Sequence, residues 1–246
     1  MIVEYGSEEP GRRGRPNPLE AARRMMAAYG VFERGVLEAA ASVNGGEMPL
    51  DEAEGRRREL LAWMEEGDLA SSLGPGGLDF MRTPVGAAAE ADYRDSLESL
   101  EFAAALAWAL RLRRSLGPVD AFTDPLALAA ALPEPFGPAP PFSVAIRTVP
   151  DGALRGALHY CNRWCWRAEV ALSKAFSFDG LAAMRAGTVR VVARKALEEG
   201  IIDEVLDGDF PLNGVPFRNL SRDEAERVAT VTGTRASALA WLLGDS

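Results

Sequence analysis

The stretch EFAAALAWAL, residues 101–110, places nine consecutive apolar residues behind a single glutamate. A helix that is apolar on every side has to be surrounded by other helices. The run is also far shorter than the ~20 apolar residues that a membrane-spanning helix needs. We therefore expect residues 87–115 to form the central helix of an all-α, multi-helix globular bundle.

Helix boundaries can be read on both sides of this segment. Asn17 followed by Pro18 is a typical helix start, because the asparagine side chain can cap and proline suits the first helical position. Ser221 and Glu224 form a capping box that opens the last helix, and Gly244 marks its end. Apolar residues at helical spacing then predict helices at 18–43, 51–66, 124–132, 151–176, 186–199 and 221–243.

Two other segments predict turns. The stretch LGPGGLDFMRTPVG, residues 73–86, is rich in glycine and proline and is interpreted as a turn region. Asn213-Gly214 lies between alternating apolar and polar residues, which predicts one small β-hairpin near the C-terminus.

The domain organisation follows from composition. Residues 1–17 combine glycine, proline and charge without apolar periodicity, which is typical of a flexible arm. Residues 18–246 are expected to form a single helical domain. The proline-rich stretch Pro133–Pro141 is barred from regular helix and sheet. It therefore allows two halves, 18–132 and 142–246, joined by a stiff crossing.

Charge and composition restrict the partners. The chain of 246 residues has a formal net charge of −9, which disfavours phosphate backbones and anionic membranes. No segment resembles a signal peptide, and we expect a cytoplasmic protein. Arginine greatly outnumbers lysine, and alanine, glycine and leucine are abundant, which indicates a GC-rich, bacterial genome.

The stretch LHYCNRWCWRAEV, residues 158–170, holds the only histidine and both cysteines. In a helix, Cys161 and Cys165 share one apolar face, whereas His159 points nearly the opposite way. One helix cannot aim all three at one metal ion, and cysteines four apart fit a disulfide poorly. We favour core packing over a metal site or a reactive thiol, and we expect no metal and no cofactor.

Common catalytic and nucleic-acid motifs give little support for a chemistry. The chain has no dinucleotide-binding, Walker or zinc-protease motif, and a Ser–His–Asp triad would have to use His159. The tetrapeptide Arg13-Gly14-Arg15-Pro16 matches the short core of an AT-hook, which binds the minor groove of DNA. It occurs once, on an acidic chain, so nucleic acid remains an unlikely partner that deletion of residues 1–17 would test.

Buried carboxylates are the remaining route to catalysis. The weak candidates are Glu101, which precedes the apolar run, and Glu169, which lies in the aromatic-rich helix. Both could face a shared cavity with Arg163 or Arg167. The alternative is structural, because Glu101 can pair along the surface and Glu169 is within one helical turn of an arginine.

Three segments carry a resemblance to a known family. EFAAALAWAL at 101–110, RWCW at 163–166 and RASALAW at 235–241 are similar to motifs of a bacterial uncharacterised family, domain-of-unknown-function family 4272. The resemblance implies a mostly helical fold and no assigned activity. Cys165, Ala236 and Ala240 stand where the family has polar residues. If the family has a polar site, part of it is missing in this chain; if the remaining tryptophans and charges of these motifs only build the core, nothing is lost.

We therefore expect a non-catalytic module that binds another protein, of the adaptor or immunity kind. The alternative is a small-molecule-binding or hydrolytic enzyme with Glu101, Arg163, Glu169 and Arg235 around an inter-helix pocket. A pocket on which carboxylates and arginines converge favours the enzyme, whereas an exposed apolar or acidic patch favours the binding module.

Overall fold

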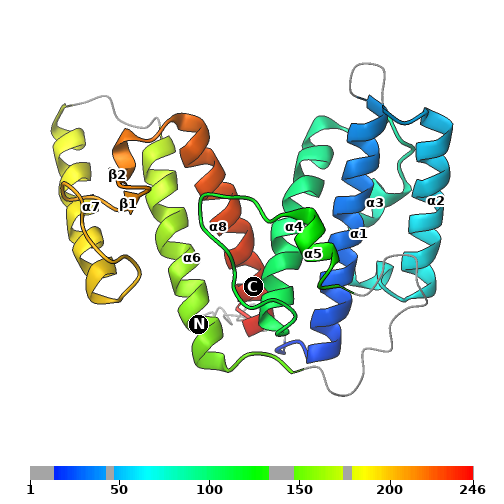
Figure 1. The fold of residues 1–246 in the computed structure, drawn as a ribbon, viewed down its shortest axis with the longest axis horizontal. Helices are drawn as coiled ribbons and strands as arrows, with labels where there is room; N and C mark the ends of the chain where they lie inside the picture. The colour runs from blue at the N-terminus through cyan, green and yellow to red at the C-terminus, as the bar shows by residue number, and fades with distance from the viewer. Residues whose placement is uncertain (1–13, 43–46, 133–146, 174–178, 246) are drawn as a thin grey trace, which may run out of the picture.

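The computed structural model describes residues 14–42, 47–132, 147–173 and 179–245. Within these ranges the chain is an all-α bundle with a single two-stranded hairpin (Figure 1). No helix in these ranges is long and apolar enough to cross a membrane. The proline-rich stretch 133–141 and residues 1–13 of the predicted arm lie outside the described residues. The helices are α1 (Pro18–Ser42), α2 (Leu50–Glu66), α3 (Pro75–Arg82), α4 (Glu90–Ala109), α5 (Pro125–Ala129), α6 (Asp151–Leu172), α7 (Asp179–Glu198) and α8 (Arg222–Leu243).

The long helices form a row in which α4 and α8 are the central pair. In Figure 1 the order from right to left is α2, α1, α4, α8, α6 and α7. The main contacts are those of α1 with α2 and α4, of α4 with α8, and of α8 with α6. Residues 103–107 of α4 are completely buried, which confirms that the apolar run lies in the middle of the bundle.

Two clusters of buried side chains hold the row together. The larger cluster joins α1, α2, α4, the second half of α8 and the first half of α6. The smaller cluster lies among α6, α7, the first half of α8 and the hairpin. Its centre is Trp164, whose ring packs edge-on against Phe210 at 5.3 Å between centroids and also contacts Phe217. Because α6 and α8 contribute to both clusters, they tie the two ends of the row together.

The predicted hairpin is confirmed. Strands β1 (Pro211–Leu212) and β2 (Val215–Pro216) pair antiparallel. The two residues between them, Asn213 and Gly214, have φ angles of 51° and 78°. Positive φ at both central positions is what a tight turn of this hand requires, and asparagine and glycine tolerate it best.

Several predicted helix ends are also confirmed. The Asn17 side chain accepts hydrogen bonds from the backbone N–H groups of Leu19 and Glu20 at 2.9 and 3.0 Å. Ser221 and Glu224 form the predicted capping box. Gly244 adopts the left-handed conformation, with φ 76°, at the end of α8.

The prediction of one helix over residues 87–115 is wrong at both ends. α4 begins at Glu90, and it ends at Ala109 because Arg111 turns to φ 63°. The N–H groups of Arg111 and Leu112 close the last turn on the carbonyls of Trp108 and Ala107 at 2.9 and 2.8 Å. The following loop can thereby return across the bundle to α4 and α8.

The segment interpreted as a turn region contains helix α3, so that prediction is wrong as well. Pro75 starts the helix at a position that suits proline. Arg57 of α2 donates to the carbonyl of Met81 at 2.9 Å, and Glu54 accepts from the N–H of Val85 at 3.2 Å. Hydrogen bonds from Arg57 also lower the pKa of Glu54 to about 2. These contacts attach α3 to α2.

Three further helix ends differ from the prediction. α5 ends at Ala129 instead of residue 132, α6 ends at Leu172 instead of residue 176, and α7 begins at Asp179 instead of residue 186. Ser173 follows α6 in an extended conformation, with φ −60° and ψ 113°. The predicted continuation of this helix beyond Leu172 therefore fails at Ser173.

Candidate functional site

Two of the four predicted site residues meet in the core. Glu101 on α4 and Arg235 on α8 form an ion pair, with both Nε and Nη2 of the arginine 2.8 Å from Oε2 of the carboxylate. Glu101 is completely buried and Arg235 is 2 % exposed. The interpretation that Glu101 pairs along the surface is therefore wrong.

The loop that follows α4 supplies the other partners of this pair. Glu101 accepts hydrogen bonds from the backbone N–H and the hydroxyl of Thr123. Arg235 donates through Nη1 to the carbonyls of Gly117 and Pro118, at 3.3 and 2.8 Å. Every nitrogen of the guanidinium thus has an acceptor, and the carboxylate has donors on both oxygens. The arrangement is that of a structural clasp that fixes the loop onto α4 and α8.

The other two predicted residues lie elsewhere. Arg163 on α6 binds Glu199, the residue after α7, at 3.1 Å, and His159 binds the same carboxylate at 2.8 Å. Hydrogen bonds from His159 and Arg163 lower the pKa of Glu199. Glu169 is exposed, with its carboxylate 3.7 Å from the sulfur of Cys165. The structure therefore brings Glu101 and Arg235 together and separates them from the other two.

Of the two cysteines of α6, Cys161 lies in the larger hydrophobic cluster, as interpreted from the sequence, whereas Cys165 is half-buried beside the carboxylate of Glu169. Cys161 is 2 % exposed, and burial raises the pKa of its thiol to about 11. Burial also raises the pKa of Cys165, as do the charge and hydrogen bond of Glu169. Both thiols are consequently protonated at neutral pH, which makes them poor nucleophiles. Within the described part of the chain, no group of three or more His, Cys, Asp or Glu residues lies close enough to hold a metal ion.

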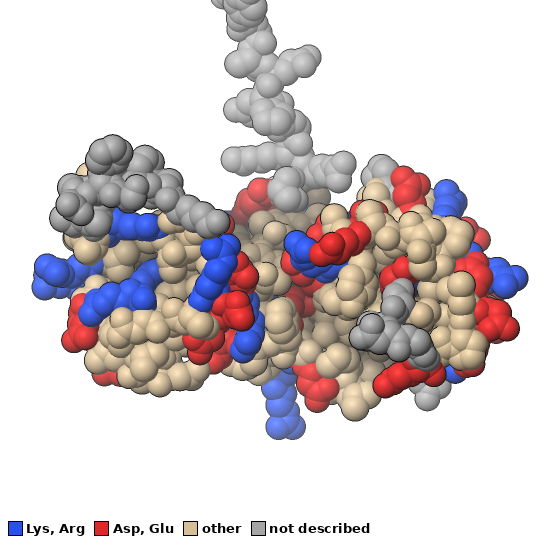
Figure 2. All heavy atoms as spheres, turned by 90° about the horizontal axis from the view of Figure 1, so that it is seen from above, with Lys and Arg blue, Asp and Glu red and all other residues tan. Residues whose placement is uncertain are grey.

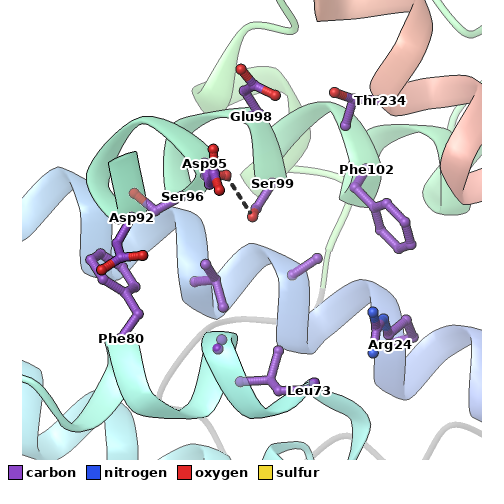
Figure 3. Close-up of a pocket in the computed structure, with 15 residues that line it drawn as sticks. Arg24, Leu73, Phe80, Asp92, Asp95, Ser96, Glu98, Ser99, Phe102 and Thr234 are labelled. Carbon is purple, nitrogen blue, oxygen red and sulfur yellow. Dashed lines mark hydrogen bonds between the residues drawn. The ribbon is translucent and has the colours of Figure 1, made fainter. Parts of the chain in front are cut away.

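A groove of about 440 Å³ opens between α1, α3 and α4 (Figure 3). We call it the acidic groove, because three carboxylates of α4 line it. None of Glu101, Arg163, Glu169 and Arg235 belongs to its walls. Its lining residues are Arg24, Ala28, Val31, Leu73, Gly74, Gly76, Gly77, Phe80, Asp92, Asp95, Ser96, Glu98, Ser99, Phe102 and Thr234.

The three carboxylates follow one another along α4. Asp92, Asp95 and Glu98 are spaced by three residues, so they lie on neighbouring positions of the helix surface. Asp92 and Asp95 are exposed, and neither forms an ion pair with any residue that the structure describes. Burial and the nearby charge of Asp95 raise the pKa of Glu98. At Asp92 and Asp95 the groove therefore carries negative charge that no ion pair among the described residues neutralises.

The single arginine of the groove is occupied at the other end. The guanidinium of Arg24 lies over the rings of Phe102 and Trp241, at 5.6 and 5.8 Å from their centroids. It also donates to the carbonyl of Ser72. In Figure 3, Arg24 lies below Phe102 at one end, whereas Asp92 lies near Phe80 at the other. The groove thus has an acidic end at Asp92 and an opposite end that the guanidinium of Arg24 occupies.

The floor and rim of the groove differ in character. Ala28, Val31 and Leu73 provide apolar surface. The rim contains Gly74 and Gly76, and a Cβ atom added at either position would meet nothing within 4 Å. The rim is therefore open backbone that leaves room for an extended chain.

The sequence contains one sign of this groove, the three-residue spacing of Asp92, Asp95 and Glu98. The spacing of the α4 carboxylates was visible, but a polar stripe on a helix is normally a solvated face. This face becomes a groove because α3 packs beside it. The glycines and prolines of residues 73–86 predicted a turn in place of that helix. No family model, curated protein or solved structure matches the chain. The resemblance to family 4272 stays a prediction.

Proposed function

We propose that the chain is a non-catalytic cytoplasmic module that binds another protein, and that it holds a basic segment of that partner in the acidic groove. The observation that supports this proposal is the pair of exposed carboxylates, Asp92 and Asp95, at the edge of a groove of about 440 Å³. Such a volume is typical of a binding site.

Charge and shape both favour an arginine or lysine side chain as the group bound. The carboxylates can accept hydrogen bonds from a guanidinium or ammonium group. The apolar floor of Ala28, Val31 and Leu73 can cover the methylene stem of the same side chain. A basic segment would thereby use both parts of the groove.

The alternative of a hydrolytic enzyme built on Glu101 and Arg235 receives less support from this geometry. A general acid or base has to reach a proton of the substrate. Both oxygens of Glu101 already accept hydrogen bonds from the protein, and the carboxylate is completely buried. The pair supports a structural role, so the acidic groove is the better candidate for recognition.

The proposal can be tested with a short fluorescein-labelled peptide in which arginine alternates with leucine, and with the same peptide carrying glutamate in place of arginine. Fluorescence polarisation should show that the arginine peptide binds and that the glutamate peptide does not. The affinity for the arginine peptide should fall as salt is added. The double variant Asp92→Asn/Asp95→Asn should lower the affinity about tenfold, because each exposed ion pair contributes up to about 1 kcal/mol.

A matched double variant, Asp203→Asn/Glu204→Gln, removes the same charge from an exposed loop outside the groove. It should keep nearly all of the affinity. Equal losses in the two double variants would show that only the net charge of the protein attracts the peptide, and the proposed site would be wrong.

A further inference from the structure

A second cavity, of about 280 Å³, lies at the other end of the molecule between α6, α7 and the loop before the hairpin. We call it the arginine cavity. Four arginines and two aspartates line it, together with small and apolar residues. Its lining residues are Arg167, Val170, Arg185, Ala186, Val189, Arg190, Asp207, Gly208, Asp209 and Arg218.

Arg167 is the most deeply buried arginine of this cavity, with 3 % of its surface exposed. Its Nε and Nη2 donate to the two carboxylate oxygens of Asp209 at 2.6 and 2.7 Å. Its guanidinium carbon lies 4.6 Å from the ring centroid of Phe217. The third nitrogen, Nη1, is buried without a hydrogen-bond partner among the described residues. Buried donors of folded proteins are nearly always paired. Arg34 and Trp164 also have a buried nitrogen without a partner, but Arg167 is the one of the three that lines this cavity.

Asp209 is not available to supply that acceptor. Besides Arg167, its oxygens accept from the backbone N–H groups of Phe210 and Arg218 at 2.8 and 3.0 Å. Burial alone would raise the pKa of Asp209, but the hydrogen bonds from Arg167 and the backbone outweigh it and lower the pKa. The carboxylate is therefore ionised and its acceptor capacity is used.

The remaining charges leave the cavity positive. Arg218 pairs with Asp207 at 3.3 Å, whereas the acceptor of Arg185 within the described part of the chain is the carbonyl of Ser173. Arg190 has no carboxylate partner among the described residues. It lies against Gly208, where φ is 78° and a Cβ would come within 3.2 Å of its Nε. A glycine is thus needed for the loop to lie so close to this arginine.

Among the described residues, the half-buried Arg185 and the exposed Arg190 thus have no carboxylate partner, in a chain whose net charge is −9. In Figure 2, basic side chains gather at the end of the molecule that carries α7. An anion with several acceptor oxygens and two negative charges would balance the excess and give Nη1 of Arg167 its acceptor. Guanidinium forks match phosphate oxygens in this way.

We propose that the arginine cavity binds the phosphate group of a small molecule, with Arg167, Arg185 and Arg190 as its ligands. The volume of about 280 Å³ suits a small phosphate monoester or free phosphate. The overall acidity of the chain disfavours a nucleic acid as the source of that phosphate.

Isothermal titration calorimetry of the full chain tests this with inorganic phosphate, glycerol 3-phosphate, citrate and a single-stranded oligonucleotide. We expect inorganic phosphate, glycerol 3-phosphate or both to bind. The probe that binds more tightly shows whether the cavity takes free phosphate or a phosphate monoester. Arg190→Gln should weaken that binding roughly tenfold, because a charged hydrogen bond is lost. Arg167→Lys should weaken it as well, since an ammonium group cannot both bind Asp209 and reach the ligand.

Arg114→Gln is the matched control, because Arg114 is exposed and lies outside the cavity. It should leave the affinity unchanged, as should Asp92→Asn/Asp95→Asn in the acidic groove, so the two proposals succeed or fail separately. The inference is overturned if neither phosphate probe binds, if Arg114→Gln weakens binding as much as Arg190→Gln, or if citrate or the oligonucleotide binds more tightly. Arg190→Gln keeps the test valid even if Arg167→Lys does not fold.

Discussion

Arg235 reaches Glu101 across 134 residues of sequence, and the loop after α4 closes around the pair. Removing two charges from water is costly, and only good geometry with further hydrogen bonds offsets that cost. Thr123, Gly117 and Pro118 supply those bonds here. The pair therefore fixes one loop conformation as well as joining α4 to α8.

Breaking either side of this pair should be strongly destabilising. Glu101→Leu leaves a buried guanidinium without its counter-charge, and Arg235→Leu leaves a buried carboxylate. We expect each variant to lose about 3–5 kcal/mol of unfolding free energy, measured by urea denaturation. The double variant should lose less than the sum of the two, because no unpaired charge remains. Additive losses would contradict a coupled pair.

At the scale of single residues the sequence singled out both members of this pair without predicting that they contact each other. Glu101 was singled out because it precedes an apolar run, and Arg235 because it lies in one of the three segments that resemble family 4272. Their mutual contact depends on how α4 and α8 cross and on the return of the loop. Neither is encoded in local spacing. The pair Arg167 and Asp209 was missed for the same reason, since 42 residues separate them.

The helices themselves pack through small residues of α1. A Cβ at Gly35 would overlap the hydroxyl oxygen of Ser96 on α4, and a Cβ at Gly30 would come within 2.8 Å of the sulfur of Met64 on α2. α1 can therefore approach both neighbours closely. This approach sets the distance between α1 and α4, which are two walls of the acidic groove.

Gly35→Ala should consequently destabilise the protein by about 1–3 kcal/mol, as overpacking of a core does. Gly55→Ala is the matched control, because position 55 in α2 has nothing within 4 Å of the added methyl group. It should stabilise the protein by about 0.5–1 kcal/mol through helix propensity. Thermal unfolding of the two variants measures both effects. A stabilising Gly35→Ala would contradict the close packing of α1 on α4.

At the scale of elements, most helices and the hairpin were predictable because their caps and periodicity are local. Asn17 and Ser221 begin helices and Gly244 ends one, by hydrogen bonds and backbone angles that involve neighbouring residues only. The errors at α3 and α4 have a different origin. Arg111 adopts a left-handed angle that its residue type does not favour. α3 forms despite three glycines nearby because α2 holds it through Arg57 and Glu54.

For the whole molecule, composition gives the net charge of −9, but it does not show where the acidic and basic side chains gather on the fold. The acidic groove lies beside the larger hydrophobic cluster, and the arginine cavity lies beside the smaller one. Each charged site is thus placed at its own end of the row of helices. A catalytic site built from the four predicted residues stays a prediction. In the structure, two of them, Glu101 and Arg235, are in contact.

The central claim is that the acidic groove is the surface that receives a basic segment. The most direct measurement is the affinity of the arginine–leucine peptide for Gly76→Trp. Position 76 lines the groove and has open space for a side chain, so an indole there should fill the groove without disturbing the fold. The control is Gly55→Trp, which adds the same group to an open position of α2 outside the groove.

The account predicts that Gly76→Trp abolishes peptide binding while its unfolding temperature stays close to that of the parent, and that Gly55→Trp binds normally. Undiminished binding by a folded Gly76→Trp variant would contradict the account, because the peptide would then lie somewhere other than the acidic groove.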